Sequence, residues 1–358
     1  YRYNQADVLH TLDRLDESLA LLEQAIAINP NYARTWSKKG QLLRRLKRYA
    51  EALIAYDKAL AIDAHYGWAW NGRGLVLSAI GRHEDALAAF ANASKENPRD
   101  VWFWYNQADE LMTLQRYQEV LNVLERALTL NPQHLESLGK RGQALRNLGR
   151  YKEAVAAYDQ ALTIDMHYAW AWNGRGLALE QIGKREEALT SYERAAQEDP
   201  SGMWYWINQV NPLMNVGRLN EALTVCEMAT RAAPESDIAW ARLGQVLRRM
   251  DRHGEAIDAY ERALALDPQY AWAWNGKGLA YAALGRWAEA LLCYEKATTY
   301  ESGDVWFWHN NGEALLHLER YDEAIHAFST ALAINPQHES SRTQRTEARR
   351  RRASTSQE

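Results

Sequence analysis

Tryptophan and asparagine recur together in this sequence, at spacings that place both side chains on one face of a helix. Trp102 precedes Asn106 by four residues and Trp68 precedes Asn71 by three, and residues three or four apart are neighbours on a helix surface. An asparagine amide both donates and accepts hydrogen bonds, so it can pair with both polar groups of a peptide backbone. A tryptophan adds a flat apolar wall. The combination predicts a surface that binds an extended peptide.

Six such pairs occur along the chain. They are Trp68 with Asn71, Trp102 with Asn106, Trp170 with Asn173, Trp204 with Asn208, Trp272 with Asn275 and Trp306 with Asn310, and Asn4 takes the matching place near the start. A folded protein gains little by exposing six large indoles, so we expect these side chains to bind a ligand. The structural alternative stays open, in which each indole covers a seam and each asparagine caps or packs a helix.

A period of 34 residues orders these pairs and predicts the elements that carry them. Trp36, Trp70 and Trp104 are 34 residues apart, and each period also holds a glycine, an acidic residue followed by alanine, a tyrosine or phenylalanine, and a closing proline. Apolar residues recur at helical spacing over two stretches joined by a short turn. One helical pair cannot bury its own apolar face, so successive pairs must stack into a solenoid. The sequence predicts an all-α fold.

This pattern resembles the tetratricopeptide repeat family. With Ala33 as repeat position 1, the shared residues fall at positions 4, 8, 20, 24, 27 and 32. The resemblance implies a tetratricopeptide-repeat α-solenoid, a right-handed superhelix of antiparallel helix pairs whose concave groove is lined by positions 2, 5, 6, 9, 12 and 13. The six tryptophans of the pairs, at position 2, would then face the groove, while Trp70, Trp104, Trp172, Trp206, Trp274 and Trp308, at position 4, would face the core.

The repeats are expected to form one solenoid over residues 1–338. Its repeats are 1–32, 33–66, 67–100, 101–134, 135–168, 169–202, 203–236, 237–270, 271–304 and 305–338. Pro212 falls inside one first helix and predicts a local kink, because proline has no amide donor. Residues 339–358, which include Arg349–Arg352, are expected to form a polar capping segment and a basic disordered tail.

A longer period of 102 residues groups the repeats in threes. The segments His65-Tyr66-Gly67-Trp68, His167-Tyr168-Ala169-Trp170 and Gln269-Tyr270-Ala271-Trp272 are near copies. Core packing needs only the 34-residue period. The triplet therefore records either a duplicated block of three repeats or a surface that uses three repeat types, and the sequence leaves both open.

Basic residues gather at the groove positions implied by the resemblance. The nine are Arg34, Lys38, Arg44, Arg45, Lys140, Arg146, Arg242, Arg248 and Arg249, against the four acidic residues Asp109, Glu136, Glu180 and Glu313. The whole chain has a formal net charge of −4, so the excess is local. A positive groove attracts carboxylates, which arginine can bind through two hydrogen bonds. The alternative is that these are solvated surface charges.

No residue set suited to catalysis or metal binding is found. Gly72-Arg73-Gly74 falls inside a predicted helix without a following phosphate-loop lysine, and no paired-cysteine or His-Glu-x-x-His ligand set occurs. Cys226 and Cys293 are expected to be inert core thiols. We therefore expect no enzymatic activity, no cofactor and no metal. The sequence also lacks a signal peptide and any run of about 18 apolar residues, so we expect a cytoplasmic protein with no membrane span.

The leading hypothesis is a non-catalytic protein-interaction scaffold. It would bind an extended, acidic or carboxylate-bearing peptide in a groove lined by tryptophan, asparagine and arginine. In the second hypothesis the chain is the ligand-sensing or substrate-selecting C-terminal array of a longer signalling or enzymatic protein, whose effector domain lies upstream. A third, single-stranded nucleic acid in the same groove, is disfavoured by the net charge of −4 and by Asp109, Glu180 and Glu313.

Overall fold

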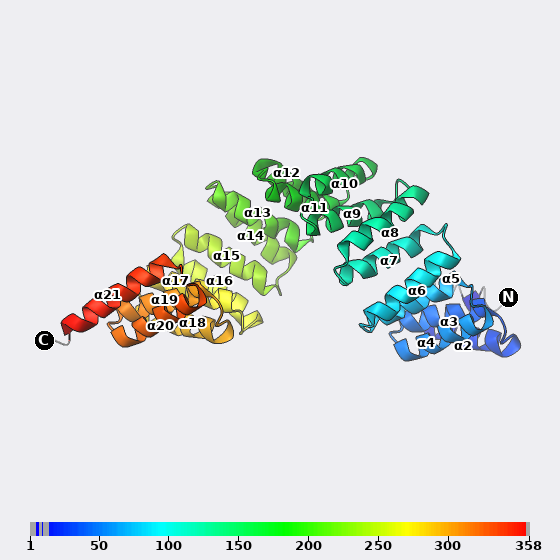
Figure 1. Ribbon diagram of the computed structural model, residues 1–358, viewed down its shortest axis with the longest axis horizontal. Helices are drawn as coiled ribbons and strands as arrows, with labels where there is room; N and C mark the ends of the chain where they lie inside the picture. Colours follow the sequence, from blue (N-terminus) through cyan, green and yellow to red (C-terminus); the bar gives the residue numbers. More distant parts are fainter. Residues whose placement is uncertain (1–4, 7–8, 10–13, 356–358) are drawn as a thin grey trace. The chain divides into compact units, whose positions relative to one another are not determined.

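The computed structural model describes residues 5, 6, 9 and 14–355. This described part contains 20 helices and no strand (Figure 1). The chain divides into two compact bodies, an N-terminal body of residues 1–184 and a C-terminal body of residues 185–358. The prediction of an all-α fold is confirmed. Asn4 lies outside the described residues.

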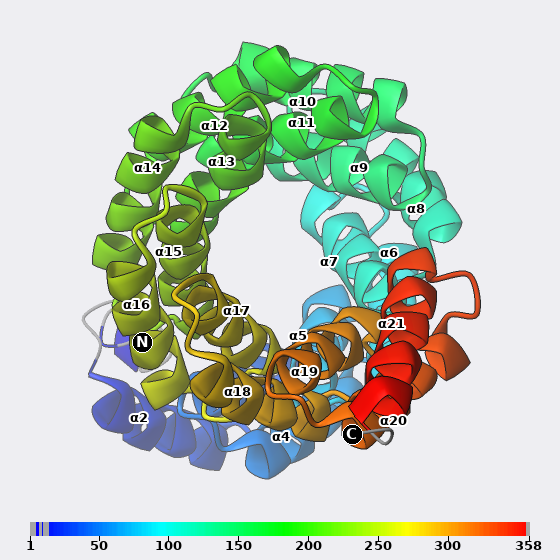
Figure 2. The same cartoon turned by 90° about the vertical axis from the view of Figure 1, so that its left-hand side faces the viewer.

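In the N-terminal body, two sets of helices alternate along the chain. The first helices of the repeats are α3 (Ala33–Arg45), α5 (Gly67–Ala79), α7 (Val101–Thr113), α9 (Leu135–Asn147) and α11 (Ala169–Gln181). The second helices are α2 (Leu15–Ile28), α4 (Tyr49–Ile62), α6 (His83–Glu96), α8 (Tyr117–Leu130) and α10 (Tyr151–Ile164). Figure 2 shows α5, α7, α9 and α11 together on one side of this body, and their partner helices on the other.

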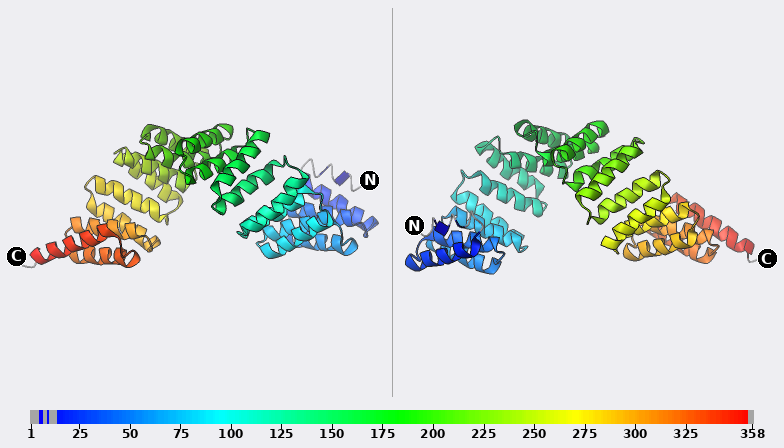
Figure 3. Two further views of the ribbon diagram at one scale, coloured as in Figure 1. Left: turned by 45° about the horizontal axis from the view of Figure 1, so that its top comes forward. Right: turned by 180° about the vertical axis from the view of Figure 1, so that it is seen from behind.

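The C-terminal body repeats this arrangement. Its first helices are α13 (Met203–Asn215), α15 (Asp237–Arg249), α17 (Ala271–Ala283) and α19 (Val305–His317). Its other helices are α12 (Arg185–Glu198), α14 (Leu219–Ala232), α16 (His253–Leu266), α18 (Trp287–Tyr300), α20 (Tyr321–Ile334) and α21 (Glu339–Thr355). Within each body, helical pairs follow one another in chain order (Figure 3), so residues at one repeat position line up on neighbouring first helices.

Glycine and a buried aromatic ring set the separation of the two helices in a repeat. A Cβ added at Gly142 of α9 would lie 2.8 Å from the ring of Tyr158 in α10, and Tyr158 is buried. The same contact joins Gly40 to Tyr56, Gly74 to Phe90, Gly244 to Tyr260, Gly278 to Tyr294 and Gly312 to Phe328. A ring can lie this close to a helix only where no side chain intervenes, so these positions require glycine.

The turn between the two helices of a repeat reverses the chain through one residue with positive φ. At Gly149 φ is +74°, and the Arg150 amide donates to the Leu145 carbonyl at 2.9 Å. This closes the first helix with the hydrogen bond of a Schellman motif. The second helix then begins with an ion pair, in which Arg150 Nη2 lies 2.7 Å from Glu153 Oε2.

Pro212 and the arginine run near the C-terminus both lie in helices. Helix α13 runs from Met203 to Asn215 without a break, with Pro212 inside it. The run Arg349–Arg352, expected in a disordered tail, belongs instead to α21. Glu347 pairs with both Arg350 and Arg351, and Arg352 lies 2.6 Å from Asp322 of α20. These ion pairs hold the arginines on the helix, while residues 356–358 lie outside the described part.

Gly142→Ala should destabilise the fold, because the new methyl group overlaps a buried ring that has no room to move. We expect a loss of about 1–3 kcal/mol in the free energy of unfolding, measured by urea denaturation. Gly254→Ala is the matched control. Gly254 lies in α16 and an added Cβ there meets nothing within 4 Å, so alanine should stabilise that helix by about 0.5–1 kcal/mol. Equal effects of the two substitutions would contradict the packing argument.

Candidate functional site

The tryptophans at position 4 hold the turns between repeats. Trp36 Nε1 donates to the Pro30 carbonyl at 2.8 Å, and Trp104 Nε1 to the Pro98 carbonyl at 2.9 Å. The same bond joins Trp70 to Ala64, Trp172 to Met166, Trp206 to Pro200, Trp240 to Pro234, Trp274 to Pro268 and Trp308 to Ser302. These indoles are partly buried, and their role is structural.

The tryptophans at position 2 divide into two groups. Four of them are about half exposed: Trp68 at 49%, Trp102 at 48%, Trp204 at 51% and Trp306 at 53%. The other two, Trp170 and Trp272, are only partly exposed. Their ring centroids lie 5.9 Å from Tyr168 and 6.1 Å from Tyr270, respectively. The structure therefore brings four of the six predicted indoles to the surface and packs two against tyrosines.

The asparagines pair with one another across neighbouring first helices. Asn106 Nδ2 in α7 donates to Asn71 Oδ1 in α5 at 2.8 Å, and Asn310 in α19 donates in the same way to Asn275 in α17 at 2.8 Å. Asn71, Asn275 and Asn310 are buried, whereas Asn106, Asn173 and Asn208 are partly buried. Each described pair uses one donor and one acceptor internally. The pairing also fixes the direction of the amides, because the Asn71 oxygen is the acceptor and its nitrogen remains a donor.

Arginines at position 12 lie beside the buried tyrosines of the second helices. Arg44 hydrogen-bonds the Tyr56 hydroxyl, and burial raises the pKa of Tyr56 to about 12, so this hydroxyl stays protonated. The arrangement recurs with Arg146 at Tyr158 and with Arg248 at Tyr260. In all three arginines Nε is buried without a hydrogen-bond partner. The three guanidinium groups therefore lie in one repeated environment.

The other predicted basic residues differ in how far their charge is neutralised. Lys140 Nζ lies 2.5 Å from Asp109 Oδ1. Arg242 lies over the Trp272 ring, 5.1 Å from its centroid, and donates to Gln245 Oε1 at 2.9 Å. Arg34, Arg45 and Arg249 are exposed, while Lys38, Glu136, Glu180 and Glu313 are partly exposed. Of these acids Glu313 has a lowered pKa, because it accepts a hydrogen bond from His309.

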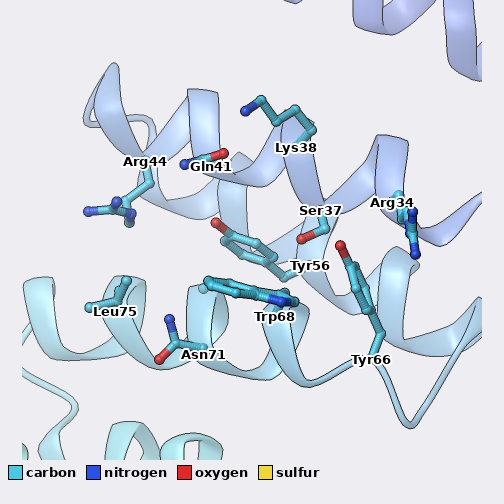
Figure 4. A pocket seen from close by; sticks show the side chains of 11 residues that line it. Arg34, Ser37, Lys38, Gln41, Arg44, Tyr56, Tyr66, Trp68, Asn71 and Leu75 are labelled. Carbon is cyan, nitrogen blue, oxygen red and sulfur yellow. The ribbon is translucent and has the colours of Figure 1, made fainter. Parts of the chain in front are cut away.

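A cavity of about 350 Å³ between α3 and α5 gathers several of the predicted residues (Figure 4). Arg34, Lys38 and Arg44 of α3 line it together with Trp68 and Asn71 of α5. The other residues that line it are Ser37, Gln41, Tyr56, Tyr66, Gly72 and Leu75. None of these described residues is acidic. The cavity therefore combines cationic, amide and hydroxyl groups with aromatic walls.

Sequence reasoning missed the tyrosines of this cavity. It noted Tyr56 only as one of the tyrosines or phenylalanines that recur in each period, but the hydroxyl of Tyr56 reaches Arg44 and the cavity. It also left out Tyr66, although the recurrence of Tyr66, Tyr168 and Tyr270 directly before the first helices was visible in the 102-residue period. That recurrence was the signal that could have identified them.

A buried histidine, also missed, supports the exposed Trp102. The ring centroids of His134 and Trp102 are 4.8 Å apart, with the rings edge to face. His134 Nδ1 accepts a hydrogen bond from the Ser137 amide at 3.3 Å and so caps α9. Burial lowers the pKa of His134, although Glu136 opposes this shift. His338 lies in the same way beside Trp306, with 4.6 Å between the ring centroids.

The two cysteines, expected to be inert core thiols, are both buried. Burial raises the pKa of the Cys226 thiol to about 12 and that of Cys293 to about 11, so both thiols stay protonated. Gly72 and Gly74 pack against Tyr56 and Phe90 inside a helical layer. Within residues 5, 6, 9 and 14–355, no group of three or more potential metal-ligating His, Cys, Asp or Glu side chains is found. In the same described part, no helix has the length and apolar character needed to cross a membrane.

Sequence profiles of known families match segments over most of the chain. Profiles described as "Tetratricopeptide repeat" match residues 1–65, 31–95, 103–134, 169–201, 271–303 and 305–338, and one described as "TPR repeat" matches residues 142–183 and 244–285. The chain belongs to the tetratricopeptide repeat family. Repeats of this family build protein–protein interaction modules and are generally non-catalytic. No curated protein sequence matches the chain.

Solved structures of tetratricopeptide repeat proteins share this fold. The APC/C hetero-tetramer Cut9-Hcn1 has a TM-score of 0.56 at 16% identity, over 97% of this chain and 83% of that chain. The C-terminal part of a TPR repeat-containing protein from Cytophaga hutchinsonii has a TM-score of 0.53 at 18% identity, over 66% and 97%. YrrB, described as "a TPR protein with an unusual peptide-binding site", has a TM-score of 0.45 at 26% identity, over 51% and 95%. At 16% and 18% sequence identity, the similarity to Cut9-Hcn1 and to the Cytophaga hutchinsonii protein shows the fold alone.

Acidification should destabilise the repeat array through His134. Its lowered pKa means that the unfolded chain binds a proton more readily, so the contribution to stability is fully present above the unfolded pKa of about 6.5 and is lost as the pH falls from there through the lower pKa of the folded state. His134→Asn keeps a capping side chain that does not titrate. We expect the urea midpoint to fall less in the variant than in the parent between about pH 7.5 and about pH 5.5. An identical fall in both proteins would show that His134 does not contribute.

Proposed function

We propose that the array is a non-catalytic interaction module whose first-helix faces bind an extended peptide that is acidic or bears a carboxylate. The observation that carries this proposal is the set of half-exposed indoles, Trp68, Trp102, Trp204 and Trp306, on helices that also present amides and cations. A folded chain has no internal use for four large apolar surfaces in water. Tryptophan is also among the residues that contribute most to binding at protein interfaces.

The geometry around Trp102 supports a binding role because the indole is held in place before any ligand arrives. Its ring centroid lies 5.6 Å from Tyr105 and 4.8 Å from His134, both in edge-to-face contact. Trp306 has the same support from His309 at 5.6 Å and His338 at 4.6 Å. A side chain that is already ordered loses little rotamer entropy on binding. These indoles therefore form rigid walls for the side chains of a bound peptide.

The paired amides supply polar groups beside those walls. Each asparagine carries two donors and an acceptor with two lone pairs, and the Asn71–Asn106 pair uses only one donor and one acceptor for itself. Asn71 is buried, but Asn106 is only partly buried, and its remaining groups can pair with a peptide backbone that runs across the first helices. Their orientation is fixed by the internal bond, which favours one direction of the backbone over the other.

Charge on the same helices selects the ligand. Arg34 and Arg45 of α3 and Arg249 of α15 are exposed, and Arg44 and Arg248 of the same helices hydrogen-bond the buried tyrosines Tyr56 and Tyr260. Exposed cations steer an acidic partner and raise its association rate. Acidic side chains or a terminal carboxylate on the peptide would supply anions to pair with these cations.

The proposal is tested by replacing the supported indoles. Trp102→Ala with Trp306→Ala should weaken the binding of a fluorescein-labelled peptide of alternating glutamate and glycine by about thirtyfold, or ~2 kcal/mol. Fluorescence anisotropy measures this affinity. Ile54→Ala with Leu292→Ala is the matched control, because these side chains are 60% and 63% exposed but lie on the second helices α4 and α18.

The control pair should bind as the parent does, and circular dichroism should show equal helical content in all variants. A peptide in which glutamine replaces every glutamate should bind more weakly than the glutamate peptide. Equal affinity for the two peptides would refute the preference for acidic ligands. Equal losses in the tryptophan and control variants would refute binding at the first-helix faces.

A further inference from the structure

Three seams between neighbouring first helices carry the same set of polar and aromatic residues. In the N-terminal body they lie between α3 and α5 and between α9 and α11, and in the C-terminal body between α15 and α17. The shared residues are Gln41, Arg44, Tyr56, Tyr66, Trp68 and Asn71 in the first seam, with Gln143, Arg146, Tyr158, Tyr168, Trp170 and Asn173 in the second and Gln245, Arg248, Tyr260, Tyr270, Trp272 and Asn275 in the third. Each set is 102 residues from the next.

The polar lining of the first seam favours a ligand that accepts hydrogen bonds. Three cations, Arg34, Lys38 and Arg44, line its cavity, and none of the described lining residues is acidic. Asn71 adds a donor, because its oxygen already accepts a hydrogen bond from Asn106. Figure 4 shows the nitrogen of Asn71 on the side that faces Trp68 and Leu75. The Tyr56 hydroxyl is protonated and adds another. A carboxylate or phosphate offers the acceptors and the negative charge that such a lining complements.

The indole takes a different place in the first seam from the one it takes in the other two. Trp170 lies 6.0 Å from Tyr158 and 5.9 Å from Tyr168, and Trp272 lies 6.3 Å from Tyr260 and 6.1 Å from Tyr270, between ring centroids. Trp68 instead meets Phe103 of α7 edge to face at 4.9 Å. The space beside Tyr56 and Tyr66 remains as a cavity.

The residue at position 5 of the preceding helix accounts for this difference. It is Ser37 in the first seam, Gly139 in the second and Ala241 in the third. A Cβ added at Gly139 would lie 2.7 Å from the Trp170 ring, which is closer than real Cβ contacts. Ala241 has a Cβ and Trp272 still packs on its tyrosines, so a Cβ alone does not displace the indole. The hydroxyl of Ser37, which neither Gly139 nor Ala241 carries, is therefore the group that takes the space an indole placed like that of Trp170 would need. Trp68 accordingly turns outward, where it is half exposed.

We propose that the α3–α5 seam is an oxyanion site for a carboxylate or phosphate side chain of the bound peptide, and that Ser37 keeps it open by excluding the Trp68 indole. The site rests on the proposed function, because its ligand is one side chain of the peptide bound there. The oxyanion pairs with Arg44, while Arg34 and Lys38 add positive charge along the same cavity, and the alkyl part of the side chain packs on Trp68. The second seam is closed and less basic, since Glu136 stands where the first has Arg34.

Two substitutions that change the seam in different ways test this assignment. Ser37→Gly removes no charge but gives the Trp68 indole room to fill the cavity. Arg44→Gln leaves the space and removes one cation. Each should weaken the binding of the glutamate–glycine peptide by about tenfold, the scale of one lost charge-assisted hydrogen bond. Arg126→Gln is the charge-matched control, because Arg126 is exposed on the second helix α8. It should bind as the parent does.

Three labelled peptides distinguish the source of the oxyanion. They carry glutamate, phosphoserine or glutamine at the same positions, and anisotropy measures each against the parent and the three variants. If glutamate and phosphoserine peptides both lose affinity in Ser37→Gly and Arg44→Gln, the site is supported, and the peptide bound more tightly by the parent identifies the preferred group. If Arg44→Gln fails to fold by circular dichroism, Ser37→Gly carries the test alone.

A direct readout of the indole completes the test. In protein labelled with ¹⁵N-tryptophan, the Trp68 indole resonance is assigned by its loss in Trp68→Phe, and Ser37→Gly should shift it as the ring moves against Tyr56 and Tyr66. An unchanged resonance, with parent-like affinity in Ser37→Gly and Arg44→Gln, would overturn the seam site while leaving the acidic-peptide proposal standing. A parent that binds glutamate, phosphoserine and glutamine peptides equally would overturn both.

Discussion

The packing of one aromatic ring against glycines of two successive first helices determines where most other side chains lie. Tyr158 illustrates it. A Cβ at Gly142 of α9 would contact this ring, and so would one at Gly174 of α11. Because both positions lack a side chain, one tyrosine sets the separation of the helices within a repeat and that between repeats. The ring is fully buried in the core, and its hydroxyl hydrogen-bonds Arg146. The contact that stabilises the solenoid thus also positions an arginine of the candidate binding face.

The three repeat types differ in what their seams contain, and the difference follows from position 6 of the first helix. Where this position is glycine, as at Gly72, the tyrosine of the preceding repeat reaches the seam and meets an arginine. Where it is asparagine, as at Asn106, the side chain bonds Asn71 of the preceding helix instead. In the seam between α7 and α9, Trp102 contacts His134, which precedes α9. A duplication alone would explain three copies of these features, but it does not explain why each seam within a triplet has its own chemistry.

The fold could be predicted from the sequence because its period is local and repeats without an insertion. The expected repeats beginning at Ala33, Gly67 and Val101 coincide with the first residues of α3, α5 and α7, since glycine, alanine and aromatic residues recur at fixed offsets. The site could be predicted less completely. Trp68 and Trp170 stand in near-identical sequences, yet only Trp68 is half exposed. What separates them is Ser37 against Gly139, on a different helix. The bond between Asn71 and Asn106 likewise depends on how closely two helices approach, which spacing along one helix does not determine.

The net charge of the chain is a poor guide to its ligand because the two helices of a repeat carry different charges. Acidic residues cluster at the start of the second helices, where Glu119 and Glu153 pair with the arginine three residues earlier. Such exposed pairs contribute little stability, but they neutralise the turn arginines and place the surplus of carboxylates on the second helices. Arg34, Lys38 and Arg44 project from a first helix into a cavity whose described lining has no acid. An acidic peptide would therefore be attracted to the first-helix face and repelled from the opposite one, and a protein with a formal charge of −4 can still select a negatively charged partner.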